Sequence, residues 1–307
     1  MRLGRSCQWL PLPSAGMAQQ WRCAGMRWAT DGPALIWDGG RRSALTPGRT
    51  VAFGVEEGGA RTCVGARGNP CPARRPVPAR TTGARCGECA RLDRAHSVAA
   101  DTLADDPRPY RVYLAWFGPG LVKVGITAVE RGSARLLEQG AVCFTPLGTG
   151  PLMAARRAEE TLRAAFGVPD RIPYAEKRAV RAALPASEEE RAAEIAALHA
   201  RALALPGWPE SLSPEPLRTV DHVRLFGLDA APAAGEITEL TAGGAVGGRL
   251  VAVAGPDLHL LTGEGTVVVL DTRLMTGWDL VPAADGRPAF PVRPLARPAA
   301  HAQDELF

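Results

Sequence analysis

The sequence contains very little lysine and no long apolar run. Lys123 and Lys177 are the only lysines among 307 residues, so arginine carries nearly all of the positive charge. No apolar stretch reaches the ~20 residues that a membrane-spanning helix needs, and the first residues lack the apolar region of a secretory signal. We therefore expect a cytoplasmic protein with no membrane partner. The seven cysteines are then expected to be reduced rather than paired in disulfides.

Internal repeats and a phosphate-binding glycine loop are also absent, because the glycine-rich stretches lack a strand-turn-helix context. The formal net charge of +4 is small, so it permits nucleic-acid binding without requiring it. The apolar content of 46% is enough for a real core, and 307 residues allow two domains or one elaborated domain. Oligomeric state is left open by these numbers.

Four cysteines in the first third of the chain have spacing typical of a metal site. Cys63, Cys71, Cys86 and Cys89 lie in the segments CVGARGNPC and CGEC. Two residues between the last pair let both thiolates reach one ion, and four thiolates complete the closed site of structural Zn²⁺. Because the first pair is widely spaced, three cysteines with His96 are an alternative, and four unligated thiols are another. A redox pair would leave the first two cysteines unexplained.

The segment around these cysteines is rich in arginine. Residues 61–94 contain eight arginines and two acidic residues. Loops held by zinc and bearing arginine can bind phosphates, so Arg74, Arg75 and Arg80 are candidate nucleic-acid-binding residues, with Arg131 farther along the chain. The alternative is a solvated loop surface in a protein that uses arginine throughout.

Residues 110–127 have the pattern of a β-hairpin. The stretches 110–117 and 121–127 are rich in aromatic and β-branched residues, and Gly-Pro-Gly lies between them. A three-residue loop places Tyr113 opposite Gly125, with Lys123 one diagonal step away on the same face. The other face is apolar and is expected to be core. One side of the hairpin therefore carries a phenol, an ammonium and a bare backbone, which is a site-like arrangement.

The helix expected after the hairpin carries a carboxylate on its apolar side. Glu159 lies within a stripe of residues at helical spacing, which is formed by Leu152, Ala155, Leu162 and Phe166. A buried carboxylate is costly unless it is paired or binds a metal. A salt bridge to a neighbouring arginine and a functional role both remain open.

These residues resemble the GIY-YIG nuclease superfamily, and more closely its branch with Lys-Ile-Gly or Lys-Val-Gly in the second motif. Tyr113 stands at the first-motif tyrosine and Gly125 at the second-motif glycine. Arg135 is our choice for the family arginine, with Arg131 as a competitor, and Glu159 is our choice for the metal-binding glutamate. The chain as a whole is similar to the bacterial DUF2797 family, in which a cysteine cluster precedes the hairpin.

The resemblance implies a metal-dependent phosphodiesterase site. Glu159 would hold one Mg²⁺ or Mn²⁺, which would stabilise charge on the scissile phosphate and the leaving oxygen. Tyr113 would orient or deprotonate the attacking water, and Arg135 would neutralise developing negative charge. Lys123 replaces the second-motif tyrosine, and we predict that its charge lowers the pKa of Tyr113. No histidine of the usual accessory type follows.

The predicted fold is α+β, with a GIY-YIG-like αβ core, an N-terminal cysteine-ligated zinc module and a C-terminal small β-barrel or sheet. Early strands near 26–58 are candidates to join that sheet. A capping box at Ser187 and Glu190 predicts a surface helix with an exposed His199. The expected segments are a disordered extension (1–16), a β-rich segment (17–60), the zinc module (61–107), the GIY-YIG-like domain (108–185), a helix with a proline-rich linker (186–216), the small β-barrel (217–281) and a disordered tail (282–307).

Two functions are compatible with this reading. The first is a nucleic-acid-acting phosphodiesterase of GIY-YIG type that uses Mg²⁺ or Mn²⁺. The second is a non-catalytic, zinc-containing DNA- or RNA-binding module in which Lys123 marks a degenerate nuclease fold. A protein-interaction scaffold is a weaker third reading. The sequence does not choose between DNA and RNA.

Overall fold

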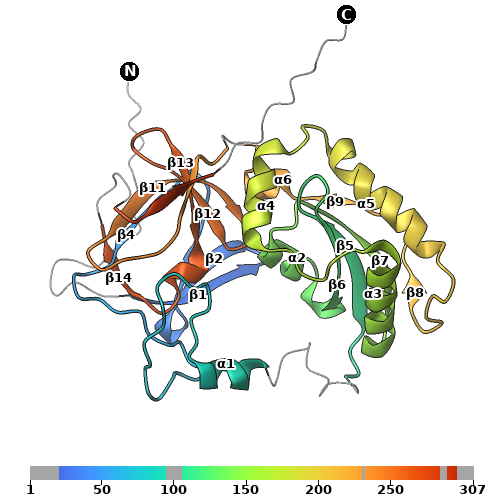
Figure 1. Ribbon diagram of the computed structural model, residues 1–307, viewed down its shortest axis with the longest axis horizontal. Coiled ribbons are helices and arrows are strands. Elements are labelled where there is room, and N and C mark those ends of the chain that lie inside the picture. The colour runs from blue at the N-terminus through green and yellow to red at the C-terminus, as the bar shows by residue number, and fades with distance from the viewer. Residues whose placement is uncertain (1–20, 95–105, 230–231, 284–288, 296–307) are drawn as a thin grey trace, which may run out of the picture.

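The computed structural model describes residues 21–94, 106–229, 232–283 and 289–295, and two β-sheets dominate it (Figure 1). The larger sheet has ten strands in the order β15-β10-β13-β12-β11-β4-β14-β1-β2-β3. Its strands are β1 (Trp21–Ala29), β2 (Gly32–Trp37), β3 (Arg42–Ala44), β4 (Thr50–Gly54), β10 (Gly235–Ile237), β11 (Ala245–Ala254), β12 (Asp257–Leu261), β13 (Val267–Asp271), β14 (Asp279–Pro282) and β15 (Val292–Pro294).

The larger sheet joins the two ends of the described chain. β4 pairs on one side with β11 and on the other with β14, which confirms that the early strands join the C-terminal ones. The predicted β-rich segment 17–60 and the predicted barrel 217–281 are therefore parts of one sheet rather than separate domains. Apolar residues of both segments, including Phe53 and Leu250, share one core.

The predicted disorder of 282–307 is wrong for the residues that the structure describes. β15 pairs with β10, and Phe290 is buried against Phe53. The predicted extension 1–16, the alternative ligand His96 and the remainder of the tail lie outside the described residues.

The smaller sheet contains the predicted hairpin. Its strands are β5 (Tyr110–Trp116), β6 (Val122–Ala128), β7 (Cys143–Gly150), β8 (Ser213–Pro214) and β9 (Val220–Asp221), and both short strands pair with β7. The amide of Phe117 donates to the carbonyl of Leu121, so the three-residue turn sets the expected register. Tyr113 lies opposite Gly125, as predicted, and Lys123 pairs with Ala115.

The described residues form the helices α1 (Gly87–Arg94), η3 (Val129–Arg131), α2 (Ala134–Gln139), α3 (Leu152–Phe166), α4 (Tyr174–Val180), η4 (Arg181–Ala183), α5 (Glu188–Leu203), α6 (Val223–Phe226) and α7 (Thr272–Met275), and η1 (Asp38–Gly40) connects β2 to β3.

Two of these helices cover the apolar face of the hairpin. α3 and α5 pack on β5 through Val112, Leu114, Leu162 and Ile195. This burial is the main stabilising term for the hairpin.

α5 begins at the predicted cap and exposes one face to solvent as a surface helix does, while its other face is buried. The Ser187 hydroxyl accepts from the amide of Glu190 at 3.1 Å. His199, predicted to be exposed, is buried, and its Nε2 lies 3.1 Å from the Glu215 carbonyl oxygen. The proline-rich stretch 206–216 does not act as a free linker, because β8 within it extends the smaller sheet.

α4 and η4 join the two sheets, between which α4 lies in Figure 1. Arg178 contacts Glu236 at 3.1 Å, and Asp257 and Asp271 at 2.6 Å each. Arg181 also reaches Asp257 at 2.6 Å. Water is largely excluded from this network, because the Asp257 side chain is 0% exposed. Both sheets therefore form one body held by buried charges.

Candidate functional site: a cysteine cluster and a hairpin face

The four predicted cysteines come together from separate loops. Their sulfur atoms all lie within 4.8 Å of one another. A tetrahedral site with metal–sulfur bonds of ~2.3 Å has sulfur–sulfur edges of about 3.8 Å, so this cluster is compact enough to hold an ion such as zinc. Cys86 and Cys89 lie at the start of α1, and Cys63 and Cys71 lie on the preceding loops. The chemistry of four thiolates fits structural Zn²⁺.

Main-chain groups shape this cluster. The amides of Gly65 and Cys86 donate to the Cys63 sulfur at 3.3 and 3.2 Å. Gly65 has φ +85°, and a Cβ there would lie 1.9 Å from the Asn69 carbonyl oxygen, so the loop requires glycine. Hydrogen bonding by the main chain at Arg75 is the largest cause that lowers the pKa of the Cys71 thiol, which falls to about 7.

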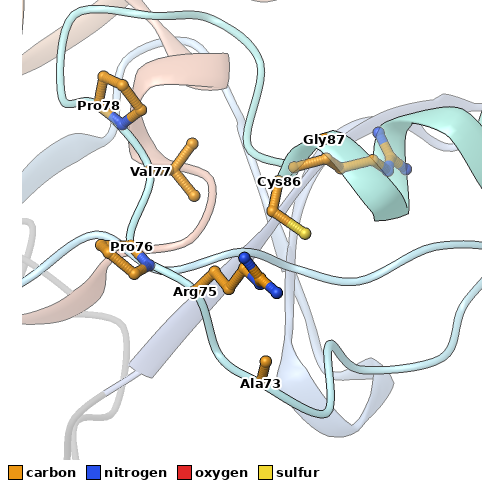
Figure 2. A pocket seen from close by; sticks show the side chains of 8 residues that line it. Ala73, Arg75, Pro76, Val77, Pro78, Cys86 and Gly87 are labelled. Atoms are coloured by element: carbon orange, nitrogen blue, oxygen red, sulfur yellow. The ribbon is translucent and has the colours of Figure 1, made fainter.

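A hollow of about 580 Å³ opens beside the cluster (Figure 2). Arg75, Arg85 and Cys86 line it, together with Pro76 and Gly87. In Figure 2 the Cys86 sulfur and the Arg75 guanidinium lie on facing walls of this hollow. Arg85 is held by Asp93 at 3.3 Å, whereas Arg75 has no ion pair within the described part of the chain.

The structure separates the arginines of this segment into three kinds: buried, exposed without an ion pair, and exposed but paired. Arg61 is buried and donates to the carbonyls of Thr276, Pro78 and Arg273, so it is a structural residue. Five others are exposed and make no ion pair with any described residue, and they are Arg67, Arg74, Arg75, Arg91 and Arg94. The candidates Arg80 and Arg131 are exposed but already paired, with Glu239 at 3.0 Å and Glu138 at 2.8 Å.

The second candidate region is the Tyr113 side of the hairpin. The tyrosine ring covers Gly125 so closely that a Cβ there would lie 2.5 Å from the phenolic oxygen. Gln139 Nε2 donates to that oxygen at 3.0 Å, and Lys123 Nζ donates to the Asp170 carbonyl at 2.9 Å. This face is not open as the alternating pattern suggested, because Leu136 and Ile172 pack over it.

The two remaining family positions lie near this face. Arg135 and Glu159 both act on the pKa of Tyr113 and of Lys123, so they lie within electrostatic range of both residues. Arg135 shares the carboxylate of Glu138 with Arg131, at 3.7 Å and 2.8 Å. Arg131 also acts on the pKa of Tyr113, but by less than Arg135 does.

Glu159 is a half-buried carboxylate that makes no ion pair with a described residue. Burial raises its pKa, and the charge of Lys123 opposes that shift only in part. No described residue makes a hydrogen bond or a salt bridge with it, whereas Glu160 on the same helix is exposed. The alternative of a salt bridge to a neighbouring arginine is not found among the described residues, so the carboxylate oxygens are available to a cation.

The predicted effect of Lys123 on Tyr113 is wrong. Burial raises the pKa of Tyr113, and the groups that oppose this are Gln139, Arg135 and Arg131 rather than Lys123. Lys123 itself is buried, and desolvation followed by the charge of Arg135 lowers its pKa to about 8. The phenol is therefore protonated at neutral pH and can orient a water but is a poor base.

Sequence reasoning missed the residues that hold this face together. Lys177 Nζ donates to the Gln139 carbonyl at 3.0 Å and lies 3.9 Å from the Phe117 ring centroid. The Tyr174 hydroxyl donates to the Glu138 carbonyl at 3.0 Å. Both contacts satisfy carbonyls at the C-terminal end of α2, which the helix leaves unpaired. One indication of Lys177 was present in the sequence, because it is, with Lys123, one of two lysines in a chain that otherwise uses arginine.

Within the described ranges, every helix is too short or too polar to cross a bilayer. A family model described as "Protein of unknown function (DUF2797)" matches residues 49–280. This stretch includes the cysteine cluster, the hairpin and most of the larger sheet. No curated protein matches the chain, and no solved structure matches it.

Proposed function

This chain belongs to the DUF2797 family, and from that premise we propose that it acts on nucleic acids through the arginine surface around its cysteine cluster. The observation that carries the proposal is the set of five exposed arginines without an ion pair among the described residues, named above. Exposed guanidinium groups without an ion pair are suited to phosphate contacts, because no salt bridge has to be broken when they bind.

The competing explanation for these arginines is that they neutralise the negative charge of the metal centre. A zinc ion with four thiolates has a net charge of about −2, which neighbouring cations offset. Arg75 and Arg85 line the hollow beside the cluster and suit that role. Arg67, Arg91 and Arg94 add positive charge beyond what neutralisation requires, and Glu88 is the exposed acid that opposes them. The surplus favours an anionic partner.

The test is fluorescence anisotropy with labelled single-stranded DNA, duplex DNA and single-stranded RNA over a series of salt concentrations. We expect the double variant Arg74→Ala/Arg75→Ala to bind more weakly and to reduce the salt slope by about 1–2, since each phosphate contact contributes about 0.7–0.9. The matched control removes Arg27 and Arg249, two exposed arginines of the larger sheet. No binding by wild type at low salt, or equal loss in both double variants, would refute the proposal. A scaffold without affinity for nucleic acid would give the first result.

A second candidate function is metal-dependent phosphodiester cleavage at the hairpin face. The half-buried Glu159, which makes no ion pair with a described residue, favours it. Glu159 would hold one Mg²⁺ or Mn²⁺, and the ion would stabilise charge on a scissile phosphate. Arg135 would lie where it can neutralise the same charge, and Tyr113 would orient the attacking water through its protonated hydroxyl.

Nicking of supercoiled plasmid and cleavage of labelled RNA, with Mn²⁺ or with EDTA, test this second function. We expect Glu159→Gln to abolish cleavage and Glu160→Gln, an exposed neighbour on α3, to retain it. Metal analysis of each preparation must show loaded cysteines, so that a negative result reflects chemistry. Loss in both variants, or no cleavage by loaded wild type, would exclude this function and leave binding alone.

A further inference from the structure

A cavity of about 380 Å³ lies where the two sheets meet, away from the cysteine cluster and the hairpin face. One wall comes from α4, η4 and the loop that precedes α5, and another comes from the end of α6. The third wall is the larger sheet, through Ala252, His259 and Val269. Cavities of this size between two parts of a protein are common ligand sites.

Cations dominate the charged groups of the cavity wall. Arg178, Arg181 and Arg191 line it, and Asp229 is the one acidic residue among the lining residues. The carboxylates that pair with these arginines lie behind them and do not line the cavity. Glu236, Asp257 and Asp271 pair with Arg178 or Arg181, and Asp221 pairs with Arg191. The pairs fix the guanidinium groups in place, so little entropy is lost when a ligand contacts them.

Two buried polar atoms at this cavity have no partner. His259 pairs with Ala252 and Val269 on the neighbouring strands, and all three line the cavity, so the imidazole is on the cavity face of the sheet. Only 6% of the surface of His259 is exposed. Within the described part of the chain, neither His259 Nε2 nor Arg181 Nε has a hydrogen-bond partner. A buried polar atom without a partner destabilises the folded protein, so these two atoms call for a partner that the chain itself does not supply among its described residues.

We propose that this cavity binds a small organic oxyanion, a phosphate or carboxylate group attached to an apolar body. The oxyanion would accept from the guanidinium groups and satisfy the unpartnered nitrogens of Arg181 and His259 after small side-chain shifts. The apolar body would lie against Leu184, Val223 and Leu228, which also line the cavity. The site shares no lining residue with the hollow beside the cysteines, so it is independent of the proposed nucleic-acid surface.

Calorimetric titration of the zinc-loaded full chain tests the proposal, with phenyl phosphate and benzoate as separate probes. We expect at least one probe to bind with a Kd of roughly 1 mM or tighter, and the two arms decide between phosphate and carboxylate. Ala182→Trp, at an exposed position that lines the cavity, should weaken binding at least about tenfold. Ala183→Trp is the matched control, because Ala183 is exposed on the same turn but does not line the cavity. Absence of binding by both probes, or equal effects of both variants, would overturn the site.

A second variant separates a binding role from a structural one. His259→Phe keeps a ring of similar shape and removes both nitrogens. If His259 serves a ligand, the variant loses probe affinity while its melting temperature without ligand stays equal to that of wild type or rises, because an unpaired buried group is removed. A lower melting temperature with unchanged probe affinity would show that His259 is structural and would overturn the proposal.

Discussion

Asp257 gives the sharpest test of how the two sheets are joined. The change is Asp257→Asn, which keeps the shape of the side chain and removes its charge. The carboxylate accepts from Arg178 Nε at 3.1 Å and Nη2 at 2.6 Å, and from Arg181 Nη1 at 2.6 Å. Both arginines belong to the α4 segment, whereas Asp257 begins β12. The substitution therefore weakens the contact between the two halves of the molecule.

The magnitude follows from the burial of this network. Asp257 is fully buried and the Arg181 side chain is 4% exposed, so water cannot replace the lost charge. Breaking one partner of a buried ion pair costs about 3–5 kcal/mol, because the remaining charge stays desolvated. We expect a loss of that size in the free energy of unfolding. The exposed pair Asp31–Arg42 at 3.2 Å gives the control, and Asp31→Asn should cost less than about 1 kcal/mol.

Urea denaturation followed by tryptophan fluorescence measures both variants. Burial by itself would raise the pKa of Asp257, but the charges of Arg181 and Arg178 outweigh it, so the folded-state pKa is lowered. Stability from such a group is present above its unfolded pKa of ~3.9 and is lost as the pH falls through the folded-state pKa. The difference between wild type and variant should therefore narrow below about pH 4. A difference at pH 7 no larger than that of the Asp31 control would refute this account of the junction.

Three further predictions use the same measurements. Gly125→Ala would place a methyl group 2.5 Å from the Tyr113 oxygen and should cost about 1–3 kcal/mol by urea denaturation, whereas Gly263→Ala, with open space around it, should be nearly neutral. Ser187→Ala removes the cap of α5 and should cost about 1 kcal/mol, and a change below the error of the melt would contradict the cap. Removal of the metal by a chelator should speed tryptic cleavage within residues 61–94, which hold one short helix, and an unchanged digestion pattern would show that no metal organises this module.

The hairpin and the cysteine cluster were predictable because their determinants are local. The three-residue turn and the two-residue period of a strand place Tyr113 opposite Gly125, whatever the rest of the chain does. Two residues between Cys86 and Cys89 bring both thiols to one point in the same way. The capping box at Ser187 is equally local.

The features that the sequence did not predict depend on packing between segments that are far apart in the chain. The Tyr113 face looked open, because Leu136 and Ile172, which cover it, belong to segments whose positions depend on tertiary structure. α5 is the expected surface helix, but the sequence did not predict that the polar residues His199 and Arg191 lie on its buried face. His199 meets the Glu215 carbonyl and Arg191 meets Asp221 at 2.6 Å, partners more than ten residues away. Phe290 shows the same limit, since it is one buried residue in a stretch too poor in apolar residues to predict order.

Lys177, one of the two lysines, lies where the hairpin face is connected to the larger sheet. Lys177 fits between the rings of Phe117 and Tyr174, at 3.9 and 4.3 Å, and donates to the end of α2, a position suited to a slender ammonium rather than a planar guanidinium. Desolvation followed by the charge of Lys123 lowers its pKa to about 7. The next residue, Arg178, enters the buried network of the larger sheet.

Adjacent residues of α4 thus fix both the helix that supports Tyr113 through Gln139 and the sheet that carries the proposed ligand cavity. A further bond joins the cysteine module to the same body, because Arg22 of β1 donates to the Thr62 carbonyl beside Cys63 at 3.0 Å. Lys177 and Arg178 are consecutive residues, so the contact to α2 and the contact to the larger sheet start from the same turn of α4. The hairpin excised alone would lose these supports, so a test of the proposed hairpin site requires the intact chain.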